Sequence, residues 1–437
     1  MDHQSLFREH LSGLVEGICV VLSELGRGSV VFGSGEQHLY FQDDEAAPFR
    51  TDRHFAWLCP LLGSGHFLRI APGKKPLLIR CVPNSYWCEN PESPALCWAS
   101  EFEIEVAETP ADAWKKLRDL GGRAQFIGSE TRFAAADGLV VNSETLITQL
   151  DWLRSVKSSY EIESIAEANC VAAQGHRAAA NVFLQGGSEF DAMLAYLGGV
   201  GASEKDLSFA PIFAMDQKAA TLHYEHRRHV KNGKVLLVDA GAVCRNYASD
   251  ISRTTLAPNV HSVFRDLWVQ LNTLQQSICQ KAVAGTTQAK MQFEAFLGIA
   301  EILENADVIR MNGDYTRALR EGILRTFCPH SLGHSLGICT HDVGDFVSNR
   351  WGVASPALEG FPTYRMGRVL EPGYVITVEP GIYFVPMLLQ KMRDSEAASC
   401  FNWPLIDELI PMGGMRIEDD VVVTKGLPRN ITREFLP

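Results

Sequence analysis

The sequence predicts a mixed α/β protein with a small N-terminal α/β domain and a larger C-terminal domain. Two observations carry this prediction. Short apolar runs alternate with helical patterns over residues 1–157, and a long helical pattern then opens residues 158–437, where strand-like runs carry carboxylates. The chain has 437 residues, 46% hydrophobic and 21% charged, which is the composition of a globular protein with a large core.

Residues 1–157 contain two helical patterns and five strand patterns. We expect helices at 6–26 and 111–122 from apolar residues spaced three and four apart. Strands are expected at SVVFG (29–33), HFLRIAP (66–72), PLLIRCV (76–82), FEIEVA (102–107) and RAQFIG (123–128). This part has no set of metal ligands and no nucleophile motif. We therefore expect it to form dimer contacts and to cover a substrate cleft.

Helix signals mark the start of the second domain just after Lys157. Ser158 and Glu161 have the spacing of a capping box, and the helical pattern that follows ends at Gly186 and Gly187. A second helix start has the same Ser-x-x-acid form at Ser188 and Asp191. A third long helix is predicted within residues 261–285.

Four carboxylates lie at or inside strand-like runs of this second part. They are Asp239 in KVLLVD, Asp250 ahead of ISRTTL, Glu379 in YVITVE and Glu418 in RIEDDVVVT. Taken singly, each is compatible with a turn cap or an exposed strand residue. Taken together, carboxylates in buried strands need charged partners, which favours a built site.

A histidine cluster adds to these carboxylates. His330, His334 and His341 occur within twelve positions, a spacing also compatible with a solvated loop. Gly333 and Gly337 flank His334, and we expect them to let the backbone approach whatever the ring binds.

Four carboxylates and one imidazole form a hard, oxygen-rich ligand set. Such a set suits Mn²⁺, with Zn²⁺ or Co²⁺ as competitors. Converging carboxylates repel one another unless cations neutralise them, and two divalent ions balance four negative charges. A paired site can bridge a hydroxide and polarise a carbonyl, so the residues predict hydrolysis.

The motifs HSLGHSLG, TVEPGIYF and RIEDD, with VDAG and SDISRT upstream, resemble the dinuclear site of the pita-bread metallopeptidases. That family includes methionine aminopeptidases, aminopeptidases P and prolidases. The chain is most similar to bacterial Xaa-Pro dipeptidases, a group that also includes organophosphorus acid anhydrolases. The resemblance runs nearly end to end, through YFQDDEAAPF, HFAWLCP and LHYEHRRH. It implies a catalytic domain with a curved, mainly antiparallel sheet and covering helices, in a homodimer.

The resemblance also assigns the metal ligands residue by residue. Asp239 matches a ligand of one ion, and His334 and Glu379 match ligands of the other. Asp250 and Glu418 match carboxylates that bridge the two ions. Glu379 further resembles the family's general acid/base, which passes a proton to the leaving nitrogen.

Substrate contacts are implied in the same way. His223, His330 and His341 match histidines that steady the scissile carbonyl. Arg416 matches an arginine that holds the substrate's terminal carboxylate, a task that suits its planar fork. Asp44 resembles an aspartate that the neighbouring subunit lends to the substrate's free amine.

The implied activity is metal-dependent hydrolysis of Xaa-Pro dipeptides with release of the C-terminal proline. Such a bond is a tertiary amide without an N–H, so a shaped pocket and a charge clamp must recognise it. Two positions depart from relatives and bear on that pocket. Phe209 and Gln288 stand where relatives carry tyrosines that line it.

Charge and cysteine content restrict partners and compartment. A formal net charge of −12 argues against a nucleic-acid partner. No apolar run approaches the ~18 residues of a membrane span, and the N-terminal residues lack a secretory pattern, so we expect no membrane partner. Eleven cysteines without a CxxC pair are typical of reduced thiols, so we expect a cytoplasmic protein.

Three other functions remain open at this stage. Aminopeptidase P-like cleavage of longer Xaa-Pro peptides would use the same metal set. Phosphotriester hydrolysis would use the same attacking group on phosphorus. A non-catalytic pita-bread binding protein would keep the fold, but such proteins usually lose metal ligands and this chain retains all five.

Overall fold

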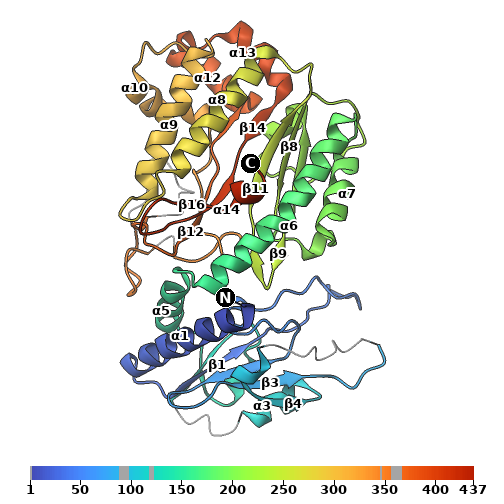
Figure 1. Ribbon diagram of the computed structural model, residues 1–437, viewed down its shortest axis with the longest axis vertical. Coiled ribbons are helices and arrows are strands. Elements are labelled where there is room, and N and C mark those ends of the chain that lie inside the picture. Colours follow the sequence, from blue (N-terminus) through green and yellow to red (C-terminus); the bar gives the residue numbers. More distant parts are fainter. Residues whose placement is uncertain (1, 88–97, 118–122, 345–346, 356–366) are drawn as a thin grey trace. The chain divides into compact units, whose positions relative to one another are not determined.

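The structure, a computed structural model, describes residues 2–87, 98–117, 123–344, 347–355 and 367–437. The chain divides into two compact units (Figure 1). The first comprises Met1–Tyr160 with Asn349–Val353, and the second comprises Glu161–Ser348 with Ala354–Pro437. Each unit is described by itself.

The first unit contains one mixed sheet with the strand order β4-β3-β2-β1-β5-β6. Its strands are β1 (Ser29–Gly33), β2 (Phe67–Ile70), β3 (Leu77–Cys81), β4 (Glu103–Ala107), β5 (Ala124–Ile127) and β6 (Val140–Val141). The β1–β2 and β2–β3 pairs are antiparallel, and the other three pairs are parallel. All five strand predictions for this part are confirmed.

Helices of the first unit are α1 (His3–Glu24), α2 (Arg53–Leu58), α3 (Pro110–Lys116), α4 (Arg132–Ala136) and α5 (Glu144–Arg154). The helix predicted at 111–122 is confirmed as far as Lys116, and residues 118–122 lie outside the described part of the chain. Thr109 caps α3 by accepting a hydrogen bond from the Asp112 N–H, and a proline occupies its first turn.

The second unit is built on short antiparallel sheets, as the sequence predicted. One has the order β11-β8-β7, another the order β12-β15-β16, and β13 pairs with β14. Its strands are β7 (Ile212–Met215), β8 (Val235–Ala240), β9 (Val243–Cys244), β10 (Tyr247–Ala248), β11 (Ile251–Leu256), β12 (Val375–Val378), β13 (Gly381–Tyr383), β14 (Gly414–Arg416), β15 (Asp419–Val422) and β16 (Arg429–Asn430). An isolated bridge between Ser252 and Glu418 joins the β11 and β15 regions.

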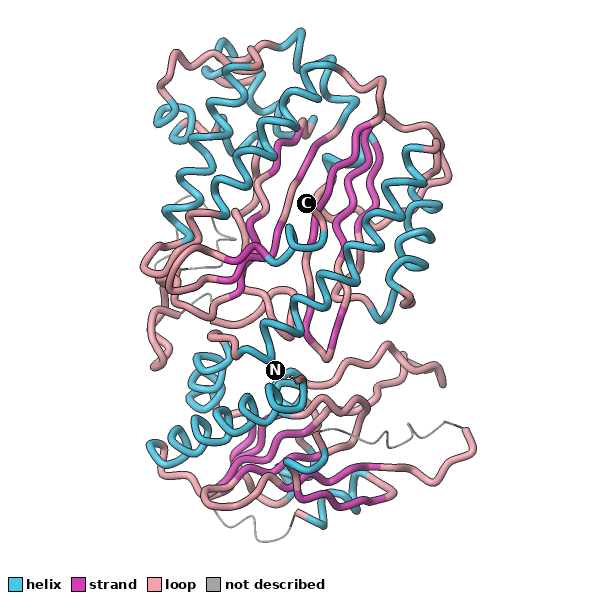
Figure 2. The backbone as a smooth tube through the Cα atoms, viewed as in Figure 1, coloured by secondary structure: helices cyan, strands magenta, loops and turns pink. Residues whose placement is uncertain are grey.

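Two pairs of long helices cover these sheets (Figure 2). Helices α6 (Ser159–Leu184) and α7 (Glu189–Val200) pack on β7 and β8 through Phe183, Tyr196, Phe213 and Leu236. Helices α8 (Ser262–Cys279) and α9 (Gln288–Asn305) pack against β12 and β15. The remaining helices are α10 (Tyr315–Arg320), α11 (Ile323–Phe327), α12 (Pro386–Arg393), α13 (Trp403–Leu409) and α14 (Ile431–Phe435).

The starts of α6 and α7 lie where the Ser-x-x-acid patterns predicted them. The capping box of Ser188 and Asp191 is present at the start of α7. Helix α6 begins next to Ser158, whose hydroxyl lies 2.8 Å from the His10 Nδ1 atom. Within the described ranges, no helix combines the length and the apolar character that crossing a membrane requires.

Candidate metal centre

Strand alternation turns the metal-ligand candidates toward one face. In β8, Leu236 and Val238 pack under the helices, so Leu237 and Asp239 face the other way. In β12, Ile376 and Val378 face α8 and α9, which turns Thr377 to the face opposite them. The two-residue period of a strand therefore places Asp239 and Thr377 on the sheet faces that the helices do not cover.

Three of the candidates form a compact ligand group. Asp250, His334 and Glu418 each offer an atom, and these atoms lie within 4.8 Å of one another. The His334 Nε2 atom is 3.3 Å from Asp250 Oδ2 and 3.7 Å from Glu379 Oε1. All three members of the group are buried. The isolated bridge between Ser252 and Glu418 accounts for the approach of two segments far apart in sequence.

The electrostatics of this group call for cations. Burial and the charge of Asp239 raise the pKa of the Asp250 carboxyl well above its usual value, and burial and the charge of Asp250 do the same for Glu418. Burial raises the pKa of Glu379 to about 7, against the lowering effects of His334 and Arg416. The Asp239 Oδ1 atom is buried, and none of the described residues forms a hydrogen bond with it. This donor set fits divalent metal ions, which would neutralise the charges and occupy that oxygen.

Arg416 lies in the floor of the site with each side-chain nitrogen engaged. Its Nε donates to the Ser252 hydroxyl at 2.8 Å, its Nη1 to the Tyr383 hydroxyl at 2.8 Å, and its Nη2 to Asp239 Oδ2. Ser252 in turn donates to Glu418 Oε2 at 2.8 Å. The arginine therefore positions two of the ligand candidates, and a substrate carboxylate would share it with them.

Tyr383 is a site residue that the sequence reasoning missed. Its fully buried hydroxyl lies 3.1 Å from the His330 Nε2 atom as well as beside Arg416. The His330 Nδ1 atom contacts the Ser331 carbonyl at 2.9 Å, so Nδ1 carries the proton and Nε2 accepts from Tyr383. Burial lowers the pKa of His330 to about 4, which keeps the ring neutral. The signal was present, because Tyr383 lies inside the TVEPGIYF motif.

A cavity of about 690 Å³ opens over this group. Its lining includes all the predicted metal ligands and most of the predicted substrate-contact residues: Asp239, Asp250, His334, Glu379, Glu418, His223, His330, His341, Arg416 and Phe209. The rings of His334 and His341 meet edge to face with centroids 4.3 Å apart.

The sequence also named Gln288 and Asp44 as residues near the substrate. Gln288 is fully buried at the first turn of α9 and is absent from the described lining. Asp44 is exposed in a turn of the first unit, so its role depends on a second subunit and stays a prediction.

Packing against β12 explains why a glycine occupies position 333. A Cβ at this position would lie 2.0 Å from the Thr377 carbonyl oxygen. The glycine lets the backbone beside His334 approach β12, where the His334 N–H donates to the Thr377 hydroxyl at 3.1 Å. The glycine therefore makes room for a neighbouring strand, and its part in the approach to a ligand stays a prediction.

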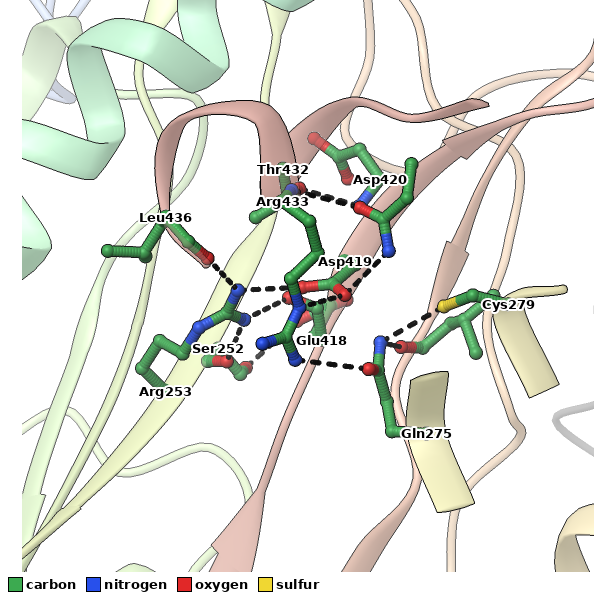
Figure 3. A network of polar contacts seen from close by, with 12 residues as sticks. Ser252, Arg253, Gln275, Cys279, Glu418, Asp419, Asp420, Thr432, Arg433 and Leu436 are labelled. Carbon is green, nitrogen blue, oxygen red and sulfur yellow. Dashed lines mark hydrogen bonds and ion pairs between the residues drawn. The ribbon is translucent and has the colours of Figure 1, made fainter. Parts of the chain in front are cut away.

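A polar network supports the ligands from behind (Figure 3). Asp420 Oδ2 accepts the backbone N–H of Asp250 at 3.1 Å and the Asn169 side-chain amide at 2.7 Å. On the opposite face of β15, Asp419 forms ion pairs with Arg253 at 2.7 Å and Arg433 at 2.8 Å. The buried cluster thus fixes the strand that follows Glu418.

Comparison with families of known proteins gives two matches that together span most of the chain. Residues 163–425 match metallopeptidase family M24, and residues 5–152 match the N-terminal domain of Xaa-Pro dipeptidases. The first match covers more than half of the chain and contains every predicted metal ligand.

Individual proteins give the same picture. The chain is 33% identical to an Xaa-Pro dipeptidase of Stenotrophomonas maltophilia over 99% of this chain and 97% of that protein. It is 34% identical to an Xaa-Pro dipeptidase of Shewanella oneidensis over 100% and 99% of the two chains. Among solved structures, proline aminopeptidase P II from Yersinia pestis superposes with a TM-score of 0.75 at 20% identity, covering 98% of this chain and 96% of that one. This last likeness concerns the pita-bread fold.

Proposed function

We propose a function from the premise that this chain belongs to metallopeptidase family M24. In this proposal the protein is a metal-dependent hydrolase that cleaves Xaa-Pro dipeptides and releases the C-terminal proline. The observation that carries this conclusion is the buried group of Asp250, His334 and Glu418 at the floor of a cavity, in a chain similar throughout its length to Xaa-Pro dipeptidases.

The ligand assignment is the first finer proposal. Asp239 would hold one ion, His334 and Glu379 would hold a second, and Asp250 and Glu418 would serve both. Two observations support it: the atoms of the central three residues lie within 4.8 Å of one another, and Asp239 keeps one buried oxygen without a partner. Oxygen-rich ligation with one imidazole favours Mn²⁺, with Zn²⁺ or Co²⁺ as competitors. The ions supply Lewis-acid activation of water and of the scissile carbonyl.

The chain's own residues supply the remaining chemistry. Glu379 is placed to move a proton to the leaving proline nitrogen, because its carboxylate borders the cavity and lies 3.6 Å from His330. His223, His330 and His341 orient the substrate carbonyl from the cavity wall. Arg416 attracts the proline carboxylate, and because Asp239 already engages it, we expect this attraction to be shared.

Assembly and compartment belong to the same proposal. The exposed Asp44 meets the substrate's amine from a second subunit, which makes the enzyme a homodimer. The two units then correspond to an N-terminal domain of residues 1–157 and a catalytic domain of residues 158–437. The free thiols among the described cysteines support a reducing, cytoplasmic compartment.

Release of proline from Ala-Pro, with and without Mn²⁺, tests the proposal. We expect turnover that His334→Ala abolishes and that His223→Ala lowers strongly. His226→Ala is the matched control for His223, since His226 lies in the same loop and is not in the described cavity lining. Faster cleavage of Ala-Pro-Gly than of Ala-Pro would instead identify an aminopeptidase P. Activity on a phosphotriester alone would identify a phosphotriesterase, and no turnover at all would favour a binding protein.

A further inference from the structure

One wall of the cavity carries charged residues that the metal centre does not use. This wall includes residues 222–225 and Arg227, which follow β7 in the sequence, together with residues 209–212 and Glu204. Glu204, Glu225 and Arg227 lie on it together with His223.

Glu225 and His223 flank a buried tyrosine in this segment. The Tyr224 hydroxyl, between them in sequence, donates to Glu189 Oε2 at 3.0 Å in the protein interior, and Tyr224 is only 4% exposed. His223 and Glu225 are both exposed, and both line the cavity.

Arg227 does not neutralise Glu225. Its Nη2 pairs with Glu204 Oε1 at 3.3 Å and also donates to the Pro211 carbonyl. Its Nη1 donates to the backbone carbonyls of Glu225 and His226. Within the described part of the chain, the Glu225 carboxylate has no hydrogen bond and no ion pair. The wall therefore presents one uncompensated negative charge beside the predicted carbonyl-binding histidine.

We propose that Glu225 binds a cationic side chain of the residue before proline, so that Lys-Pro and Arg-Pro are preferred substrates. This inference rests on the proposed dipeptidase function and adds a substrate class to it. The α-amine is a poorer partner for Glu225, because it lies two bonds from the scissile carbonyl carbon and must stay near the buried metal ligands. A lysine ammonium extends on four carbons and reaches the exposed wall.

The test compares kcat/KM for Lys-Pro and Leu-Pro in the wild type and in Glu225→Gln, with Mn²⁺ present. We expect the Lys-Pro to Leu-Pro ratio to fall about two- to fivefold in the variant, the range of an exposed ion pair. High NaCl lowers this ratio in the wild type and has little effect on it in the variant. Glu408→Gln is the control, because it makes the same change in net charge at an exposed residue outside the described lining. It should leave the ratio unchanged.

Four results would overturn the inference in distinguishable ways. If Glu225→Gln leaves kcat/KM unchanged for both dipeptides, the carboxylate does not contact the side chain. An equal loss for both dipeptides assigns Glu225 to the α-amine instead. If the metal-loaded wild type cleaves neither dipeptide, the proposed function fails and this inference fails with it, whereas cleavage of Leu-Pro with no preference for Lys-Pro refutes the inference alone.

Discussion

Replacing Tyr383 by phenylalanine tests whether the buried hydrogen-bond chain under the cavity holds the site together. The hydroxyl accepts from Arg416 at 2.8 Å and donates to His330 at 3.1 Å. The donation direction follows from the proton on His330 Nδ1, which the Ser331 carbonyl accepts. Tyr383→Phe therefore leaves one guanidinium N–H and one imidazole lone pair without partners.

The size of the effect follows from those two groups. A buried polar group that loses its partner costs about 1–3 kcal/mol. Both groups border the cavity, where solvent can replace part of the lost hydrogen bonding. We therefore expect the free energy of unfolding to fall by about 2–3 kcal/mol, near the lower end of the summed range. We also expect kcat/KM for Ala-Pro to fall, because His330 loses the contact that orients it.

Urea denaturation at neutral pH measures the stability change, and Tyr196→Phe is the matched control. Tyr196 is equally buried, but its hydroxyl has no hydrogen-bond partner in the part of the chain that the structure describes. Removing that hydroxyl should leave stability unchanged or raise it slightly. If Tyr383→Phe destabilised the protein no more than Tyr196→Phe, the reasoning about the chain from Arg416 to His330 would be refuted.

Three further predictions concern buried titratable groups. Burial lowers the pKa of His66 from 6.5 to about 4, so stability present above pH 6.5 is lost as the pH falls toward 4. The free energy of unfolding should fall by about 3 kcal/mol over this pH range. In His66→Gln, the midpoint of urea denaturation should depend less on pH than in the wild type. Glu189 accepts hydrogen bonds from Met215, Tyr224 and Arg228. Glu189→Gln should therefore lower the free energy of unfolding by about 2–3 kcal/mol, below the full value for a buried pair because Arg228 is a third exposed; a loss under about 0.5 kcal/mol would contradict this. Chelation should lower the melting temperature, more at about pH 8 than at about pH 6, because protonated carboxyls repel one another less; an equal shift at both pH values would count against the shared cation site.

Local patterns predicted most of the fold because the elements themselves are locally encoded. The apolar run at residues 29–33 is a fully buried strand, and Ser188 with Asp191 caps a helix in the expected geometry. Contacts between distant segments were harder to predict. The Gly381 to Arg416 register of β13 and β14 brings Tyr383 to Arg416, and no local spacing encodes that pairing.

The same limit explains Gly333 and Gln288. A glycine beside a histidine has the same local pattern whether it admits a ligand or a neighbouring strand. At Gly333, a Cβ would collide with the Thr377 carbonyl oxygen of the neighbouring strand. Gln288 was aligned to a pocket position, yet its side chain is buried at the start of α9. At both positions the question is what the residue faces, and that depends on packing from elsewhere in the chain.

The acidic run Glu418, Asp419 and Asp420 shows how a strand sorts identical chemistry into different tasks. Alternation turns Asp419 toward Arg253 and Arg433, where two guanidiniums satisfy its charge. Asp420 shares the face of Glu418, but its Oδ2 is engaged by the Asn169 amide and by the Asp250 backbone N–H. Only Glu418 keeps a carboxylate atom within 4.8 Å of the other ligand atoms. Asp420 Oδ1 also has no hydrogen-bond partner among the described residues, so a free oxygen alone does not make a ligand. A carboxylate becomes a candidate ligand through its strand face and through its distance from the other ligand atoms, and only the strand face can be predicted from the sequence.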